Sequence, residues 1–263
     1  MRPGHSLLAD LCVCLGFFSR LPCPWAAKEG EPLTLTLFPH AVRMLPFAGA
    51  LLGGLAAAVM AAAASLGLPP PAAAPLAIGA LAILSGAMHE DGLADCADGF
   101  FGGTSRGRKL EIMQDSRIGV FGVVSLVLSL YLRASSLTLI SERSIGLACA
   151  TVIGAAALSR SLALVPLALL PPARPSGVGF AAGKPAPGAF AAAILLAVPF
   201  ALLPVSAGAS LSQALTGIGL AAVVAHGVAA FAKRQIGGQT GDVTGAAQQL
   251  AEVTYCLVMA AHG

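Results

Sequence analysis

The stretch LPFAGALLGGLAAAVMAAAASL, residues 45–66, decides the fold class, because it contains no charged side chain and is long enough to cross a bilayer as one helix. Further apolar runs follow it along the chain, and Ala and Gly dominate them, which favours close helix packing. The sequence predicts an all-α, polytopic integral membrane helix bundle with about seven transmembrane helices, within a range of roughly six to eight. The expected spans are residues 45–66, 74–88, 118–140, 145–170, 189–205, 211–232 and 246–261.

The composition of the chain excludes the soluble classes of protein. Of its 263 residues, 57% are hydrophobic and 10% are charged, and the mean hydropathy is +0.84. A soluble globular protein carries about 25% charged residues. We therefore expect residues 1–263 to form a single membrane domain in contact with the lipid bilayer. The net charge of +3 is too small to indicate a nucleic-acid partner.

The N-terminal segment, about residues 5–20, is predicted to form a short amphipathic helix. Its larger apolar residues fall on one side of such a helix: Leu7, Leu8, Leu11, Leu15 and Phe18. We expect this helix to lie on the membrane surface or to enter it halfway. Phe17 and Phe18 are expected to anchor it at the interface.

Basic residues in the short loops predict the orientation of the chain, since Lys and Arg accumulate on the cytoplasmic side. If the segment 89–117 is cytoplasmic, Arg143 is the one loop cation on the opposite side. This asymmetry places the N-terminus and the segment 89–117 in the cytoplasm. The cations on that side are Arg2, Arg20, Lys28, Arg43, Arg106, Arg108, Lys109, Arg117, Arg174, Lys184, Lys233 and Arg234.

The segment 89–117 is dense in charge, and its first part continues the helical pattern out of the second expected span. Asp91, Asp95 and Asp98 are spaced i, i+4 and i+7, which places them within an arc of about 60° on one helix face. Because like charges this close repel, a cation is expected between them. Oxygen ligands without His or Cys favour Mg²⁺ or Mn²⁺, and Mg²⁺ completes its shell with phosphate oxygens. The row therefore predicts a metal site for a phosphate-bearing substrate.

Two other motifs fit this chemistry. Asp115 and Arg117 offer a carboxylate and a fork-shaped cation suited to bidentate phosphate binding, just before the third span. The glycine-rich turn 237–241 lies between the last two spans, where backbone N–H groups can approach an anion. Asp242 at the end of this turn can bind a metal ion. On the predicted orientation both motifs face the cytoplasm.

Each motif also has a purely structural explanation. Asp115 and Arg117 could form a local ion pair, and the turn 237–241 could be ordinary loop and capping chemistry. His89 is expected to be a polar neighbour of the acids. The aspartate row could be a solvated helix end whose acids pair with the basic residues that follow, Arg106, Arg108 and Lys109.

Arg160 lies inside the fourth expected span, between Ser159 and Ser161. A charged side chain is costly in lipid, so Arg160 is expected to face the interior of the bundle. There it either contacts a substrate phosphate or pairs internally, and Glu252 in the last span is a candidate partner. The sequence leaves both alternatives open.

Three ordered motifs resemble those of a known family. They are His89-x-Asp91-Gly92-x-Ala94-Asp95-x-x-Asp98-Gly99, Met113-x-Asp115-Ser116-Arg117-x-Gly119 and Gly237-Gly238-x-Thr240-Gly241-Asp242, preceded by Arg20-Leu21-Pro22. In this order and spacing the chain resembles the adenosylcobinamide-GDP ribazoletransferase family, also called cobalamin synthase or cobalamin 5′-phosphate synthase. The resemblance runs from about residue 17 to the last span, and the loop 174–188 matches most loosely.

The resemblance implies an enzyme that joins adenosylcobinamide-GDP to α-ribazole or its 5′-phosphate. The products are adenosylcobalamin or its 5′-phosphate, and GMP, in the last step of nucleotide-loop assembly of vitamin B12. It further implies Mg²⁺ as the cofactor and a multi-pass location in the bacterial cytoplasmic (inner) membrane, with the active site on the cytoplasmic side. A homo-oligomer and an association with other cobalamin-assembly enzymes are both left open.

The resemblance also implies roles for individual residues. The expected catalytic residues are Asp91, Asp95, Asp98, Asp115 and Arg117, with Asp115 or Asp98 as the base. The expected ligands of Mg²⁺, which would hold it against the diphosphate, are Asp91, Asp95, Asp98 and Asp242. The expected substrate contacts come from Arg117, Gly238, Gln239, Thr240, Arg160 and Lys109.

Other functions stay open at this point. A CDP-alcohol phosphotransferase would share the spacing of Asp95 and Asp98, but the downstream Asp-x-x-x-Asp of that signature is missing. A membrane prenyltransferase would need a second aspartate-rich cluster, for which Asp242 alone is a poor substitute. A transporter would place carboxylates in the middle of spans, whereas here only Glu252 is plainly intramembrane.

Overall fold

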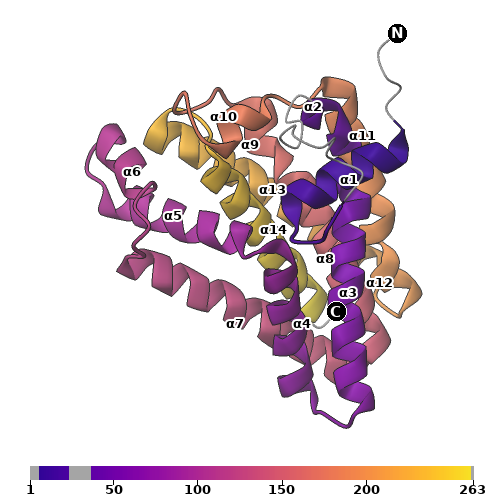
Figure 1. The fold of residues 1–263 in the computed structure, drawn as a ribbon. Helices are drawn as coiled ribbons and strands as arrows, with labels where there is room; N and C mark the ends of the chain where they lie inside the picture. Colours follow the sequence, from indigo (N-terminus) through magenta and orange to yellow (C-terminus); the bar gives the residue numbers. More distant parts are fainter. Residues whose placement is uncertain (1–5, 24–36, 262–263) are drawn as a thin grey trace.

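The computed structural model describes residues 6–23 and 37–261, and every regular element in these ranges is a helix. The one β-type contact in the same ranges is an isolated bridge between Pro172 and Gln239. The helices form a bundle (Figure 1) and run in the order α1 (Leu7–Phe18), α2 (Phe38–Ala41), a 3-10 turn (Val42–Met44), α3 (Leu45–Ser65), α4 (Pro70–Ser85), α5 (Met88–Gly102), α6 (Arg106–Ile112), α7 (Val120–Arg143), α8 (Ile145–Leu162), α9 (Leu164–Leu169), α10 (Val178–Ala182), α11 (Pro187–Ala201), α12 (Leu203–Ser206), α13 (Leu211–Ile236) and α14 (Gly241–Ala260).

Within the described part of the chain, five helical segments are long and apolar enough to cross a membrane. A sixth is obtained if α4 and α5, which meet at an angle of 90°, are counted as one bent span. The chain is therefore an all-α, multi-pass membrane protein, as the sequence predicts. The five segments are Phe38–Ser65, Val120–Arg143, Ile145–Leu169, Pro187–Ser206 and Leu211–Ile236.

This number is lower than the expected seven or so, and the difference lies in the second and the last expected spans. The second ends at Ser85, where the chain bends. The last corresponds to α14, which falls outside the apolar segments because Gln248, Gln249 and Glu252 interrupt it. These three side chains are buried among the neighbouring helices.

Helices α8 and α14 form the centre of the bundle. Most of the span that contains α8 is buried, and α14 packs against α5, α7, α8 and α13. Gly49 and Gly53 let α3 cross α8 closely, because a Cβ on Gly49 would lie 2.5 Å from the carbonyl oxygen of Ala156. Contacts of this kind between small residues allow membrane helices to approach one another, as the Ala-rich and Gly-rich composition predicts.

The bend between α4 and α5 sets the direction of the acidic helix. Gly86 ends α4 in the left-handed conformation, with φ of 65°, and the Ala87 N–H donates to the Ala82 carbonyl oxygen at 2.7 Å. Ala87 is also left-handed, with φ of 55°. The chain therefore turns by 90° before α5 begins at Met88. The acidic segment is helical, as the sequence predicts, but this bend separates its helix from the second expected span.

Helix α1 forms where the sequence predicts a helix, but it packs on the bundle along part of its length. Leu15 and Phe18 are buried in an apolar cluster shared with α2 and α3, whereas Leu7 and Leu8 are more than half exposed. The predicted apolar side thus divides between core and surface. His5, at the start of the predicted segment, lies outside the described residues.

Candidate active site

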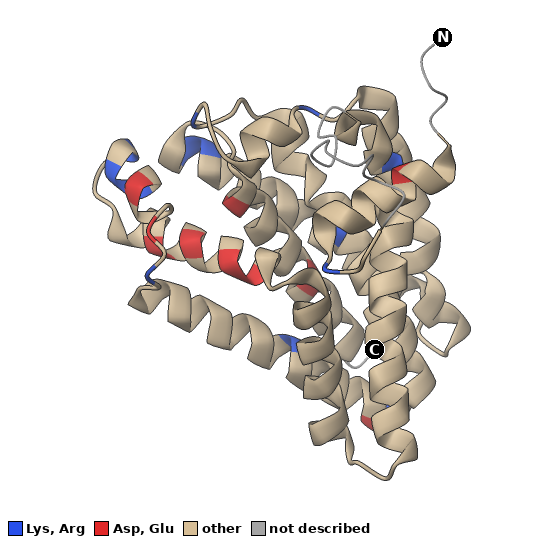
Figure 2. Ribbon diagram, in the orientation of Figure 1, with Lys and Arg blue, Asp and Glu red and all other residues tan. Residues whose placement is uncertain are grey.

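Helix α5 carries the aspartate row, and Figure 2 shows its acidic residues one after another along the helix. α5 crosses the start of α14 at Gly92, where an added Cβ would lie 2.8 Å from the carbonyl oxygen of Asp242. Glycine is required for an approach this close. The crossing brings Asp91 and Asp95 within electrostatic range of Asp242. We call Asp91, Asp95 and Asp242 the acidic cluster.

The glycine-rich turn 237–241 is paired with the loop that precedes α10. The Gln239 N–H donates to the Pro171 carbonyl oxygen, and the Ala173 N–H donates to the Gln239 carbonyl oxygen, both at 2.8 Å. A Cβ on Gly238 would collide with the same Pro171 oxygen. Gly238 and the Gln239 amide therefore serve this backbone pairing, which fixes the position of the turn.

The other predicted substrate contacts near this turn have protein partners. The Thr240 hydroxyl caps α14 by accepting from the Val243 N–H at 3.3 Å. The Gln239 side-chain nitrogen donates to the Gly179 carbonyl oxygen at 3.2 Å. The Lys109 ammonium donates to the Gln235 side-chain oxygen. In this structure these three side chains hold the turn and its neighbours together.

Arg174 is the cation of the acidic cluster, and sequence reasoning missed it. Its Nη2 lies 3.4 Å from Asp242 Oδ2, an oxygen that also accepts from the Thr240 hydroxyl at 3.1 Å. The other terminal nitrogen, Nη1, is buried without a hydrogen-bond partner. A guanidinium with a free donor beside carboxylates suits a ligand that brings phosphate oxygens.

Burial and neighbouring carboxylates make the acidic cluster hard to ionise fully. Burial and the negative charges of Asp242 and Asp91 raise the pKa of Asp95 to about 7. Burial also raises the pKa of Asp242, against the lowering effect of Arg174. A bound cation would relieve this repulsion between carboxylates.

The acidic cluster is not a complete metal cage. Within residues 6–23 and 37–261, no three His, Cys, Asp or Glu side chains converge as ready ligands of one ion. Mg²⁺ does not require such a cage, because it usually takes one or two protein carboxylates and completes its shell with water and phosphate oxygens. The oxygen-only donors of the acidic cluster therefore fit Mg²⁺ held together with a phosphate-bearing ligand.

Asp98 lies close enough to Asp95 for its charge to raise the pKa of Asp95 as well, but both of its carboxylate oxygens already have partners at the start of α7. Its Oδ2 accepts from the Gly119 N–H at 2.7 Å, and its Oδ1 accepts from the Gly122 N–H at 2.9 Å. Both amides lie at the start of α7, where unpaired N–H groups and the helix dipole attract a carboxylate. The side chain of Asp98 thus caps α7.

Asp115 and Arg117 form a local ion pair in the loop between α6 and α7. Arg117 Nη2 lies 2.7 Å from Asp115 Oδ2, and this pairing lowers the pKa of Asp115 to about 2. The Arg117 side chain is 86% exposed. Asp115 also lines a cavity of about 430 Å³ together with Asp91 and Asp95. The loop therefore faces the acidic cluster across an open cavity.

Arg160 pairs internally, which is one of the two alternatives that the sequence leaves open. It is buried, and its Nη1 lies 3.7 Å from Glu252 Oε2. Arg133, on α7, is fully buried and bridges Glu90 and Glu252 at 3.1 and 3.0 Å. We call these four residues the buried ion network. It ties α5, where Glu90 is the residue before Asp91, to α7, α8 and α14.

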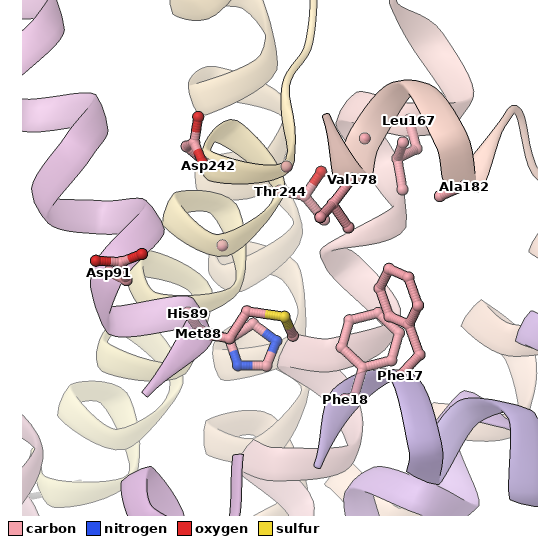
Figure 3. Close-up of a pocket in the computed structure, with 13 residues that line it drawn as sticks. Phe17, Phe18, Met88, His89, Asp91, Leu167, Val178, Ala182, Asp242 and Thr244 are labelled. Atoms are coloured by element: carbon pink, nitrogen blue, oxygen red, sulfur yellow. The ribbon is translucent and has the colours of Figure 1, made fainter. Parts of the chain in front are cut away.

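An apolar pocket of about 160 Å³ lies beside the acidic cluster. Figure 3 shows Asp91 and Asp242 on one side of it and Phe17 and Phe18 on the other. The His89 ring stacks on Phe18, with 5.7 Å between ring centroids, and its Nε2 is buried without a hydrogen-bond partner. The sequence predicts interface anchors at Phe17 and Phe18 and a polar neighbour of the acids at His89. It does not predict that these residues line a common pocket.

The fold and the site define a multi-pass membrane protein with a carboxylate-rich, arginine-containing site suited to a phosphate-bearing ligand. The sequence profile of the cobalamin-5-phosphate synthase family matches residues 10–260, and the chain belongs to this family. This confirms the resemblance seen in the three motifs.

Individual relatives agree with the family match. A relative from Azorhizobium caulinodans, named adenosylcobinamide-GDP ribazoletransferase, is 43% identical over 256 residues, which cover 96% of each chain. A relative of the same name from Brucella anthropi is 43% identical over 264 residues, which cover 97% of this chain and 98% of the relative. No solved structure shows a significant match to the chain.

Proposed function

We propose that this chain is a membrane transferase that joins adenosylcobinamide-GDP to α-ribazole or α-ribazole 5′-phosphate. One observation carries the proposal. In a member of the cobalamin-5-phosphate synthase family, the Gly92 crossing gathers aspartates from two distant motifs into one acidic cluster beside Arg174. The bias of basic residues supports a location in the bacterial cytoplasmic membrane with this cluster on the cytoplasmic side.

The proposed reaction is a displacement at phosphorus. A hydroxyl oxygen of the ribazole forms a bond to the phosphorus next to the cobinamide, and the bond from that phosphorus to the bridging oxygen of the diphosphate breaks. GMP leaves with the bridging oxygen, and the attacking hydroxyl passes its proton to a neighbouring carboxylate. Such a transfer depends on positioning and on neutralising charge more than on covalent catalysis by the protein.

Within this proposal, each group near the cluster has a role in binding. Mg²⁺, when bound, neutralises charge on the diphosphate. Asp91, Asp95 and Asp242 would hold it, and the unpartnered Nη1 of Arg174 would donate to a phosphate oxygen. Arg117 would bind phosphate from the exposed side of the cavity. Asp98 would act as a structural cap of α7, because both of its oxygens accept amides there.

The test is a reconstitution with purified protein in lipid nanodiscs. Adenosylcobinamide-GDP, α-ribazole and MgCl₂ are supplied together and in each pairwise combination, and GMP and the corrinoid product are separated by chromatography. We expect GMP only when all three are present. If GMP does not form, and the corrinoid crosses the membrane of sealed proteoliposomes unchanged, the chain is a transporter and the proposal is wrong.

A further inference from the structure

We propose that the apolar pocket beside the acidic cluster binds the planar aromatic base of the nucleoside acceptor, and that His89 Nε2 donates a hydrogen bond to a ring nitrogen of this base. The identity of the nucleoside rests on the proposed function. The pocket itself, its stacked histidine and its position beside Asp91 and Asp242 are features of this structure.

The walls of the pocket suit a flat apolar ring. Phe17 comes from α1, Met88 from α5, Leu167 from α9 and Ala182 from α10. Aromatic walls favour a planar aromatic ligand through offset stacking and edge contacts. A corrin macrocycle with its side chains is far larger than a cavity of about 160 Å³. Of the two proposed substrates, only the base of the nucleoside matches the pocket.

His89 supplies the polar anchor in this apolar pocket. The residue is 2% exposed, and its Nε2 has no hydrogen-bond partner. Buried polar atoms in proteins are nearly always paired, so an unpaired one in a pocket wall indicates a partner on the ligand. The benzimidazole base of α-ribazole carries one ring nitrogen with a free lone pair, which can accept from an Nε2–H.

The position of the pocket places the rest of the nucleoside at the acidic cluster. Asp91 and Asp242 form the side opposite Phe17 and Phe18 (Figure 3). Asp91 also lines two neighbouring cavities, one of which contains Asp95 and Asp115. A nucleoside with its base in the pocket therefore directs its ribose toward the carboxylates. This arrangement would hold the attacking hydroxyl beside the phosphates.

The first variant blocks the pocket from its rim. Val178 lines the pocket from the short helix α10 and is 55% exposed, so a larger side chain is tolerated there without disturbing the core. We expect Val178→Trp to raise the KM for α-ribazole at least about tenfold and to leave the KM for adenosylcobinamide-GDP within about twofold. Ala181→Trp, on an exposed position of the same helix, is the matched control and should change neither constant.

The second variant tests the hydrogen bond. His89→Phe keeps a stacked ring against Phe18 but removes the donor. We expect it to raise the KM for α-ribazole about tenfold. An analogue whose base is indole-like, with C–H in place of the accepting ring nitrogen, should bind wild type and His89→Phe equally well. A purely structural loss at His89 would instead weaken both nucleosides alike.

The outcomes separate this inference from the proposed function. If the wild type forms GMP and product, but Val178→Trp leaves the KM for α-ribazole unchanged, the pocket holds another occupant such as a lipid acyl chain, and only this inference is overturned. If the wild type shows no turnover, equilibrium binding of labelled α-ribazole decides. Binding that Val178→Trp removes supports the pocket, and absence of binding to the wild type overturns it.

Discussion

The Arg174 guanidinium lies 3.4 Å from Asp242 Oδ2, although the two residues are 68 positions apart in the sequence. Arg174 follows Pro172, and Asp242 follows Gln239, and the bridge between Pro172 and Gln239 holds the two segments side by side. This backbone contact lies outside the acidic cluster, but it positions both the Arg174 cation and the Asp242 carboxylate there. The arginine offsets part of the negative charge there and keeps one donor free.

We expect Arg174→Ala to lower kcat/KM for adenosylcobinamide-GDP about 10-fold to 100-fold, because a hydrogen bond to a charged group contributes about 1.5–3 kcal/mol. Arg174→Lys should recover only part of this loss, since an ammonium group lacks the fork of donors. Steady-state GMP release measures both. Lys184→Ala, which removes an exposed cation just after helix α10, is the control and should have a smaller effect. Wild-type kinetics in Arg174→Ala would remove Arg174 from the site.

Asp91→Asn and Asp95→Asn are each expected to abolish turnover while leaving expression and membrane insertion intact. Both side chains face the cavities beside the acidic cluster, and neither has a hydrogen-bonding role comparable to that of Asp98. GMP release and the yield of detergent-purified protein are the two measurements. Near-normal rates in both variants would contradict the proposed metal site.

Asp98→Ala is expected to lower the stability of the protein and not to abolish its turnover. Removing this carboxylate leaves two amides at the start of α7 without their acceptor, and losing a helix cap costs about 0.5–2 kcal/mol. The midpoint of thermal unfolding in detergent is expected to fall, and residual activity at low temperature is expected to persist. A variant with an unchanged midpoint but no turnover would return Asp98 to the set of metal ligands.

The difference between Asp98 and its two neighbours shows where sequence reasoning reaches its limit. Hydropathy predicts the all-α membrane bundle because it depends on local pattern, whereas only the resemblance of the motifs to a known family implies that carboxylates from separate motifs meet. Helical spacing also predicts that Asp91, Asp95 and Asp98 share a face. The amides at the start of α7 that donate to Asp98, however, lie more than twenty positions farther along the chain. The spacing of the three aspartates therefore cannot predict that Asp98 accepts hydrogen bonds from them.

Two other features that the sequence does not predict, the position of Arg174 and the bend after α4, have a similar cause. Arg174 lies in the loop that matches the family most loosely, and only the backbone pairing with the turn 237–241 brings it to Asp242. The bend after α4 depends on two successive left-handed residues, and the second is Ala87, a residue type that gives no warning of this conformation. Long-range contacts and rare backbone conformations therefore account for what the sequence pattern leaves out.

Arg133→Met is expected to destabilise the protein by about 3–5 kcal/mol, because it leaves Glu90 and Glu252 buried without their cation. Glu90→Gln added to Arg133→Met should recover part of the loss by removing one of the unpaired charges. Thermal unfolding in detergent measures both variants. Arg108→Ala breaks an exposed pair with Glu111 and should cost at most about 1 kcal/mol. Equal effects of Arg133→Met and Arg108→Ala would contradict a structural role for the buried ion network.

Removal of divalent metal should stop GMP release, and addition of Mg²⁺ or Mn²⁺ should restore it, because the acidic cluster offers only oxygen ligands. Asp242→Asn is expected to raise the Mg²⁺ concentration for half-maximal activity at least about tenfold, since it removes one charged ligand beside Asp95. Glu111→Gln removes an equal charge from the exposed face of α6 and should leave this concentration unchanged. If both variants shift it equally, Mg²⁺ responds to overall charge and does not bind at the acidic cluster.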